Sequence, residues 1–282
     1  MRWVICAVAV FGLASNAFAD DLDILRGAQT VGPATFTRWS GFYAGGQFSY
    51  ASGTADFSKA SQPLVAQSLA ELAIESVLAP SNWPILGKGS TNGSGFGGFA
   101  GYNTQFQDLV LGLEASYTHS PFSITGASTP ILDRVAVVGS NEDSVSVQGT
   151  GTMTISDYGS IRARAGWVFD SILPYGFAGV ALGRGDYSVT TLVYGQQNSL
   201  LAPSPIIPCD PVLVATCVDY SFPNSAAQQG VLLYGFSVGG GFDWAVTPNI
   251  FVRAEYEYIQ FAPIGNITAS ISSARVGAGF KF

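Results

Sequence analysis

The only histidine of the chain, His119, is followed directly by Ser120, and this pair comes closest to a catalytic motif. An imidazole can deprotonate a hydroxyl, so a histidine and a serine could together hydrolyse a lipid ester. Neighbouring residues of an extended strand point to opposite faces, however, and nothing nearby supplies a clear orienting carboxylate. We therefore expect no enzymatic activity. A role for His119 as a lone haem ligand remains an unsupported alternative.

Two of the three cysteines, Cys209 and Cys217, bracket seven residues in a proline-rich stretch. Exported proteins meet oxidising conditions, so these two thiols can close a disulfide. Metal binding is the alternative, but two thiols without a nearby histidine make a poor zinc site. We expect a disulfide that staples a loop, no metal site and no cofactor that the sequence can name.

A glycine-rich stretch, GSGFGGF, formally contains the dinucleotide fingerprint at Gly93, Gly95 and Gly98. That motif has meaning only between a strand and a helix. Here an alternation of aromatic residues follows instead, so the match is accidental. Glycines in such a strand provide bends and room for neighbouring side chains.

Charged residues recur at alternate positions of several extended segments. Five are basic and four acidic: Glu114, Arg162, Arg164, Asp243, Arg253, Glu255, Glu257, Arg275 and Lys281. Such a balanced set suits a narrow interior in which charges pair with one another. We expect these residues to form a salt-bridged plug, with the lining of a continuous pore as the alternative.

The composition limits the class of protein. Of 282 residues, 48% are hydrophobic and only 11% are charged, whereas soluble domains carry roughly 25% charged residues. The formal net charge of −7 argues against nucleic-acid binding, which needs a basic surface.

The first residues have the features of a secretory signal peptide. Arg2 precedes an apolar run over residues 3–14, and Ala17 and Ala19 form an A-x-A cleavage site before Asp20. A membrane anchor is the alternative, but the run is shorter than the roughly 20 residues that a spanning helix needs. We therefore expect residues 1–19 to be removed, together with Cys6.

Eight segments of the remaining chain alternate in side-chain character with a period of two, which predicts strands. They are 41–50, 94–106, 109–118, 158–169, 174–187, 232–244, 250–259 and 271–282. Long connections at about 51–93, 119–157 and 188–231, and a medium one at about 260–270, alternate with short turns. Short turns at one end and long loops at the other are typical of outer-membrane barrels.

The two faces of these segments differ. In seven of them the apolar phase carries no charged residue, while the other phase carries the nine charges. A soluble barrel with its apolar face inward is the alternative. Aromatic residues at strand ends, a glycine- and serine-rich charged face and a last segment that runs to Phe282 favour a membrane barrel. We predict an all-β, eight-stranded antiparallel transmembrane β-barrel over residues 39–282, after a periplasmic segment at 20–38.

Several stretches resemble a known family: WSGFYAGGQFSY, SIRARAGWVFD, LPYGFAGVALG, NIFVRAEYEYIQF and ARVGAGFKF. They are similar to the small outer-membrane barrels of alphaproteobacteria, the OmpA-like, opacity-type surface antigens. Some members are described as porin-like and some as haem-binding. The resemblance implies a Gram-negative outer membrane, and it implies that Phe280 and Phe282 are recognised by the barrel-assembly machinery.

These observations lead us to expect a structural surface protein that displays its loops and contacts outer-membrane lipid and lipopolysaccharide. A narrow porin for small solutes or ions is one alternative, and haem or host-ligand binding through the external loops is another. The helix formers over residues 63–79 predict a short surface helix in the first external loop.

Overall fold

The computed structural model describes residues 38–127, 132–199 and 217–282. The expected signal peptide, most of the segment 20–38 and Cys209 lie outside the described residues, so the expected disulfide stays a prediction. Within the described part no helix is long and apolar enough to cross a membrane.

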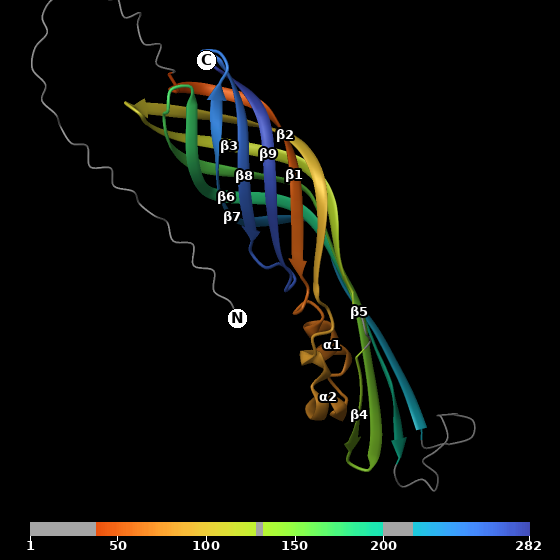
Figure 1. Cartoon of the computed structure of the whole chain (residues 1–282). Helices are drawn as coiled ribbons and strands as arrows, with labels where there is room; N and C mark the ends of the chain where they lie inside the picture. The colour runs from red at the N-terminus through yellow and green to blue at the C-terminus, as the bar shows by residue number, and fades with distance from the viewer. Residues whose placement is uncertain (1–37, 128–131, 200–216) are drawn as a thin grey trace, which may run out of the picture. The chain divides into compact units, whose positions relative to one another are not determined.

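Nine antiparallel strands make up the sheet (Figure 1). They are β1 (Gly41–Asp56), β2 (Lys88–Phe106), β3 (Leu109–Ala127), β4 (Leu132–Val138), β5 (Asn141–Trp167), β6 (Ile172–Ser199), β7 (Cys217–Ala245), β8 (Ile250–Phe261) and β9 (Thr268–Lys281). Two short helices, α1 (Gln62–Ser68) and α2 (Ala73–Leu78), and a 3₁₀ turn, Pro80–Asn82, lie between β1 and β2.

Eight of these strands close into a ring. Consecutive strands pair with one another, β1 pairs with β9, and β3 pairs with β5. Closure leaves the ring without an edge strand, which a sheet in hydrocarbon requires. β4 stands outside the ring because it pairs only with the first residues of β5. The predicted eight-stranded barrel is confirmed.

The short turns lie at the rim where the described chain begins and ends. Gln107 and Asp108 join β2 to β3, and Gln107 adopts a positive φ of 56° that permits this minimal turn. Trp39 donates a hydrogen bond to Gln105 at this rim, and the amide of Phe282 donates one to the carbonyl of Phe42. We call this rim the short-turn end and the opposite rim the long-connection end.

The strands continue well into the ranges that the alternation assigned to loops. β5, β6 and β7 contain 27, 28 and 29 residues, so most of 119–157 and 188–231 is strand and not loop. The predicted loop boundaries were therefore wrong. They were missed because the sidedness of the strands reverses beyond the barrel wall.

On β1 the outward positions change from apolar to polar toward the long-connection end. Phe42, Phe48 and Tyr50 point to the outside and are 67%, 54% and 58% exposed. The next residues on the same face, toward the long-connection end, are Ser52 and Thr54. Aromatic residues flank the apolar band of outer-membrane barrels, so Tyr50 marks the edge of the hydrocarbon region on this strand. Beyond Tyr50, the outward residues of β1 are polar.

The inward positions change in the opposite sense. On β5, Arg162 and Arg164 face the interior of the barrel, whereas Met153 and Ile155 are buried at the inward positions beyond it. A β-bulge between Ile155 and Asp157 marks the change. The extended parts of β5, β6 and β7, together with β4, therefore pack like a soluble sheet with its apolar face covered. We call them the extension.

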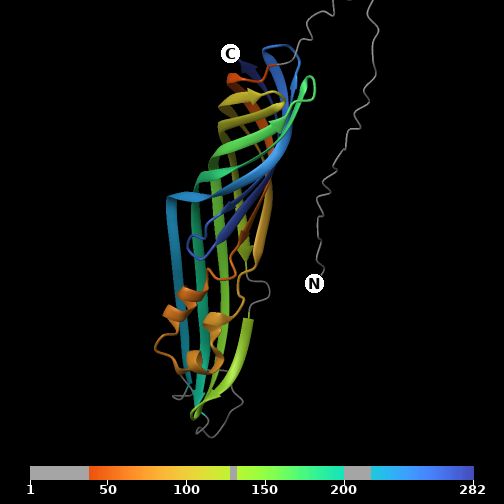
Figure 2. The ribbon, with the colours of Figure 1, turned by 90° about the vertical axis from the view of Figure 1, so that its left-hand side faces the viewer.

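Two helices cover this apolar face, where one helix was expected over 63–79 (Figures 1 and 2). Leu64, Val65 and Leu69 at α1, and Ile74 in α2, are buried. These apolar residues do not follow one helical stripe, so the chain turns between the helices to bury all four. Isolated helices this short are marginal, and packing against the strands stabilises them.

Candidate functional site: the charged interior of the barrel

The barrel encloses the charged residues that the alternation placed on one face. All nine side chains are buried, and eight of them form one layer across the lumen. This charged layer consists of Glu114 on β3, Arg162 and Arg164 on β5, Asp243 on β7, Arg253, Glu255 and Glu257 on β8, and Arg275 on β9. It holds four arginines and four carboxylates.

Glu114 lies at the centre of the charged layer. Its Oε2 lies 2.9 Å from Nη1 of Arg253 and 3.2 Å from Nη1 of Arg164, and its Oε1 contacts Arg162. Tyr43 on β1 donates a 2.6 Å hydrogen bond to the same Oε2 atom. One carboxylate thus joins three strands to its own.

Each of the other three carboxylates also pairs with one or more of the arginines. Asp243 accepts from Arg164 at 2.7 Å and from Arg253 at 2.8 Å, while both oxygens of Glu255 accept from Arg162 at 2.6 and 2.8 Å. Glu257 pairs with Arg275. Charges buried in this way are tolerated only when opposite charges and hydrogen bonds compensate them.

An aromatic layer closes the interior at the short-turn end. It is formed by Trp39, Tyr43, Phe99, Val110, Leu173, Tyr175, Phe177 and Phe251. Arg164 lies 3.7 Å above the ring of Tyr175 and Arg253 lies 4.0 Å above that of Phe99, so the guanidinium groups stack directly on this layer. Lys281, the ninth charge, lies apart, with its Nζ donating to the carbonyl of Arg38 at 3.0 Å.

An apolar outer core adjoins the charged layer on its other side. Ala51, Tyr158, Ile259 and Ile271 begin this core, and Leu69 of the helical segment continues it. The lumen is thus occupied by three successive layers. Eight-stranded barrels are just wide enough for side chains to fill, and this one is filled by aromatic, charged and apolar groups in turn.

The aromatic partners were missing from the expectation. Tyr43, Phe99 and Tyr175 stand on the inward phase of their strands, but only charged residues were sought there. A search of that phase for large side chains of any kind would have found them.

His119 and Ser120 lie where strand geometry predicts. His119 is partly exposed on the outside, whereas Ser120 is buried and donates to the carbonyl of Ser94 at 3.2 Å. The expectation that no carboxylate orients His119 was wrong: Oδ1 of Asp157 lies 2.8 Å from its Nδ1. Asp157 is 38 residues away in the chain and reaches His119 only through the register of β3 with β5.

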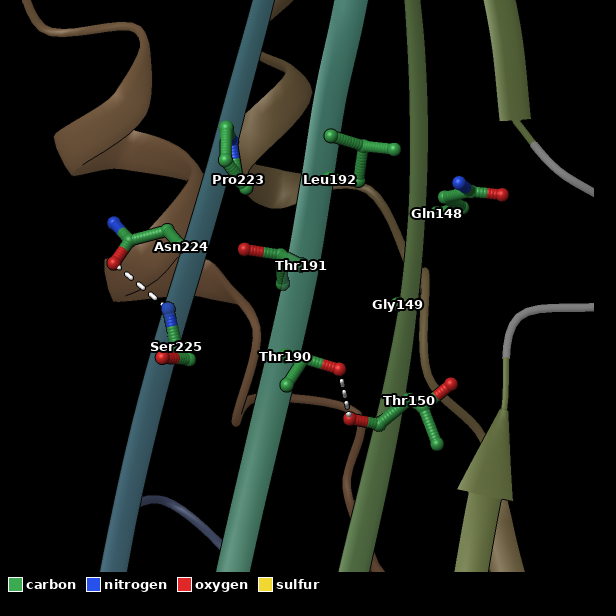
Figure 3. Close-up of a pocket in the computed structure, with 9 residues that line it drawn as sticks. All are labelled: Gln148, Gly149, Thr150, Thr190, Thr191, Leu192, Pro223, Asn224 and Ser225. Carbon is green, nitrogen blue, oxygen red and sulfur yellow. Dashed lines mark hydrogen bonds between the residues drawn. The ribbon is translucent and has the colours of Figure 1, made fainter.

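Two further features concern binding. The described residues contain no group of three or more histidine, cysteine, aspartate or glutamate side chains that could hold a metal. On the extension, a hollow of about 680 Å³ is lined by β5, β6 and β7 (Figure 3). Its lining includes Thr150, Thr190 and Asn224 and no charged side chain.

A closed antiparallel barrel with an apolar outer wall, an aromatic rim and a filled charged lumen defines the class of small membrane-spanning β-barrels. A family model described as an outer membrane protein beta-barrel domain matches residues 7–282, and the chain belongs to this family. The protein is accordingly located in the outer membrane of a Gram-negative bacterium.

Individual relatives agree with this assignment. The chain is 26% identical over 188 residues to the 25 kDa outer-membrane immunogenic protein of Brucella ovis, and the match covers 66% of this chain. The chain spans 62% of that relative's length.

Solved structures that match this chain include Neisserial surface protein A, with 16% identity and a TM-score of 0.34 over 86% of this chain and 98% of that one. The N-terminal barrel domain of Pseudomonas aeruginosa OprF matches with 16% identity and a TM-score of 0.31 over 84% and 99%. The family match and the ring of strands carry the assignment without them.

Proposed function

We propose that this protein is a non-conducting outer-membrane barrel that contributes to envelope integrity and displays its extension at the cell surface. The observation that carries the proposal is the charged layer, in which four arginines and four carboxylates pair across the lumen between two apolar layers. Ions that pass through would have to displace these pairs.

The permeability of liposomes tests this part of the proposal. The mature protein, without residues 1–19, is refolded into liposomes, folding is checked by a heat-dependent gel shift, and uptake of sucrose and potassium is compared with empty liposomes. We expect no uptake above that of empty liposomes. Uptake above this level with folded protein would replace the proposal by the narrow porin.

A variant in which a short turn replaces residues 58–86 separates the layers. It removes α1, α2 and their share of the outer core but leaves the charged and aromatic layers intact. We expect liposomes with this variant to stay tight. A leak that is seen only with the variant would mean that the outer core, and not the charged layer, blocks the lumen.

The orientation of the barrel follows from the rule that outer-membrane barrels have short periplasmic turns and longer external connections. We infer that the extension lies outside the cell and that the chain ends lie in the periplasm. In a background with Cys209→Ser and Cys217→Ser, a membrane-impermeant maleimide should label Ser225→Cys on intact cells. It should label Thr247→Cys in a short turn only after lysis. The reverse pattern would overturn this orientation.

The extension supports the display role in a second way. The hollow on β5–β7 is lined by hydroxyl and amide groups, which suit an uncharged polar ligand better than haem. We infer that any ligand bound there is of this kind. Thr190→Val would weaken such binding, whereas Thr54→Val, on the outward face of β1, serves as the control.

Two remaining expectations belong to the proposal. Ser120 and His119 lie on opposite faces, which supports a protein without hydrolytic activity, so Asp157→Asn should leave lipid turnover unchanged. Phe280 lies near the end of β9 and Phe282 directly follows the strand, with their ring centroids 5.2 Å apart. Recognition by the assembly machinery predicts that removing both aromatic rings slows insertion into the membrane.

A further inference from the structure

A second, smaller hollow, distinct from the one on the extension, lies on the lipid-facing wall of the barrel. It has a volume of about 300 Å³ and is lined by β3, β5, β6 and β7. Ile161, Leu182 and Leu232 line it and are 59%, 46% and 65% exposed, so the hollow opens outward and not into the lumen. Its lining is mostly apolar. It therefore offers hydrocarbon a recess in an otherwise convex surface.

Gly159 creates this recess. In register it stands between Tyr117 on β3 and Leu182 on β6, whose side chains flank the hollow. The backbone carbonyl of Ser116 lies too close to the position of a Cβ atom at Gly159 for any larger residue to fit without a shift. Close packing of the backbone thus keeps this position free of a side chain, and the recess lies between the flanking side chains.

A polar row borders the hollow on the side of the extension. His119, Asp157 and Arg184 are consecutive partners across β3, β5 and β6. One oxygen of Asp157, Oδ1, lies 2.8 Å from Nδ1 of His119 and accepts a 2.6 Å hydrogen bond from Tyr117. The guanidinium of Arg184 has no ion-pair partner among the described residues.

This arrangement matches an amphiphile in both chemistry and depth. The hollow lies just below the level at which the outer wall changes from apolar to polar, and the unpaired cation lies at that level. Arginine binds phosphate through charge-assisted hydrogen bonds. An acyl chain in the hollow would bring a lipid phosphate close to Arg184.

We propose that this wall binds one molecule of lipid A, the phosphorylated anchor of lipopolysaccharide, with an acyl chain in the hollow and a phosphate on Arg184. The choice of lipid rests on the orientation proposed above, because the long-connection end then faces the outer leaflet, which lipopolysaccharide forms. The hollow opens away from the lumen, so the inference is independent of whether the barrel conducts.

Native mass spectrometry tests the site directly. The full-length protein is extracted from outer membranes in mild detergent, freed of lipid, checked for folding by its gel shift and titrated with lipid A or with phosphatidylglycerol. We expect one lipid A per barrel. At the same concentration Ala115→Trp, which fills the hollow, and Arg184→Gln, which removes the cation, should each bind at least tenfold less. Phosphatidylglycerol should bind at least tenfold more weakly than lipid A.

Matched variants control for general effects on the wall. Ala163→Trp adds the same ring to an exposed position of β5 outside the hollow, and Lys88→Gln removes a cation that instead pairs with Asp56 at 3.5 Å. Both should bind lipid A like the wild type. Absence of a lipid A complex, equal binding by the hollow and control variants, or equal binding of the two lipids would each overturn the proposal.

If Ala115→Trp does not fold, the comparison of Arg184→Gln with Lys88→Gln decides alone. Thiol labelling separates a failure of the site from a failure of the orientation. A barrel with its extension outside that binds no lipid A refutes only the site.

Discussion

Nη1 of Arg253 lies 2.9 Å from Oε2 of Glu114. The two residues belong to strands four places apart in the ring of eight, and thus to facing walls of the barrel. They are separated by 139 residues in the chain. Their contact spans the lumen, so the charged layer is a set of crosslinks between walls and not a lining along each strand.

Removing the central carboxylate should be costly. Glu114→Gln leaves Arg162, Arg164 and Arg253 with less compensating charge, and breaking a buried pair costs about 3–5 kcal/mol. We expect a loss of this size in the free energy of unfolding, measured by urea titration in detergent micelles. Asp56→Asn breaks the exposed pair with Lys88 and should cost about 0–1 kcal/mol. Equal losses would mean that the charged layer does not stabilise the barrel.

Close strand packing should be sensitive to one added methyl group. A Cβ atom at Gly97 would collide with the backbone carbonyl of Tyr117, whereas one at Gly46, in the neighbouring strand, meets nothing nearer than 3.9 Å. Gly97→Ala should therefore lower the stability by about 1–3 kcal/mol, the usual cost of overpacking, and Gly46→Ala should have little effect. Urea titration of both variants checks this, and a tolerated Gly97→Ala would contradict it.

The helical segment between β1 and β2, which covers the extension, should be separable from the barrel in stability. Leu69 is fully buried in the outer core, and Leu69→Ala should cost about 2–5 kcal/mol there. Limited proteolysis should then cut the helical segment while the barrel keeps its heat-dependent gel shift. Val77→Ala, at a position that is 51% exposed, is the control and should leave the segment resistant. Loss of the gel shift in Leu69→Ala would show that the two parts unfold together.

Alkaline pH should loosen the extension. Burial, together with the charge of Asp143, raises the pKa of Tyr220 from 10.0 to about 12. Its hydroxyl donates a 2.6 Å hydrogen bond to the carbonyl of Ser144. The folded state thus favours the neutral phenol, and this contribution is complete below pH 10 and is lost as the pH rises from 10 to about 12.

Tyr220→Phe isolates this effect from the titration of other groups. Proteolytic resistance of the extension, compared between wild type and variant from pH 9 to 12, should fall more steeply in the wild type. Parallel curves would mean that ionisation of Tyr220 does not limit the stability of the extension.

The barrel wall was predictable because lipid imposes a simple rule on it. Every outward residue from Phe42 to Tyr50 must be apolar or small, and the interior must hold whatever charge the strands carry. The same rule hid the extension from the sequence analysis. From Asp157 toward the long-connection end, the outer face of the sheet meets water and the inner face is apolar. The alternation therefore continues there, but the apolar residues now point inward.

The sequence by itself determined the fold class, the membrane and the face on which each charge lies, since a period of two assigns a side to every residue of a strand. Only the tertiary structure decided which charges meet. Glu114 with Arg253, His119 with Asp157 and the hollow above Gly159 all depend on strand register and ring closure. These are set by the packing of the whole barrel, because no local stretch of chain contains both partners.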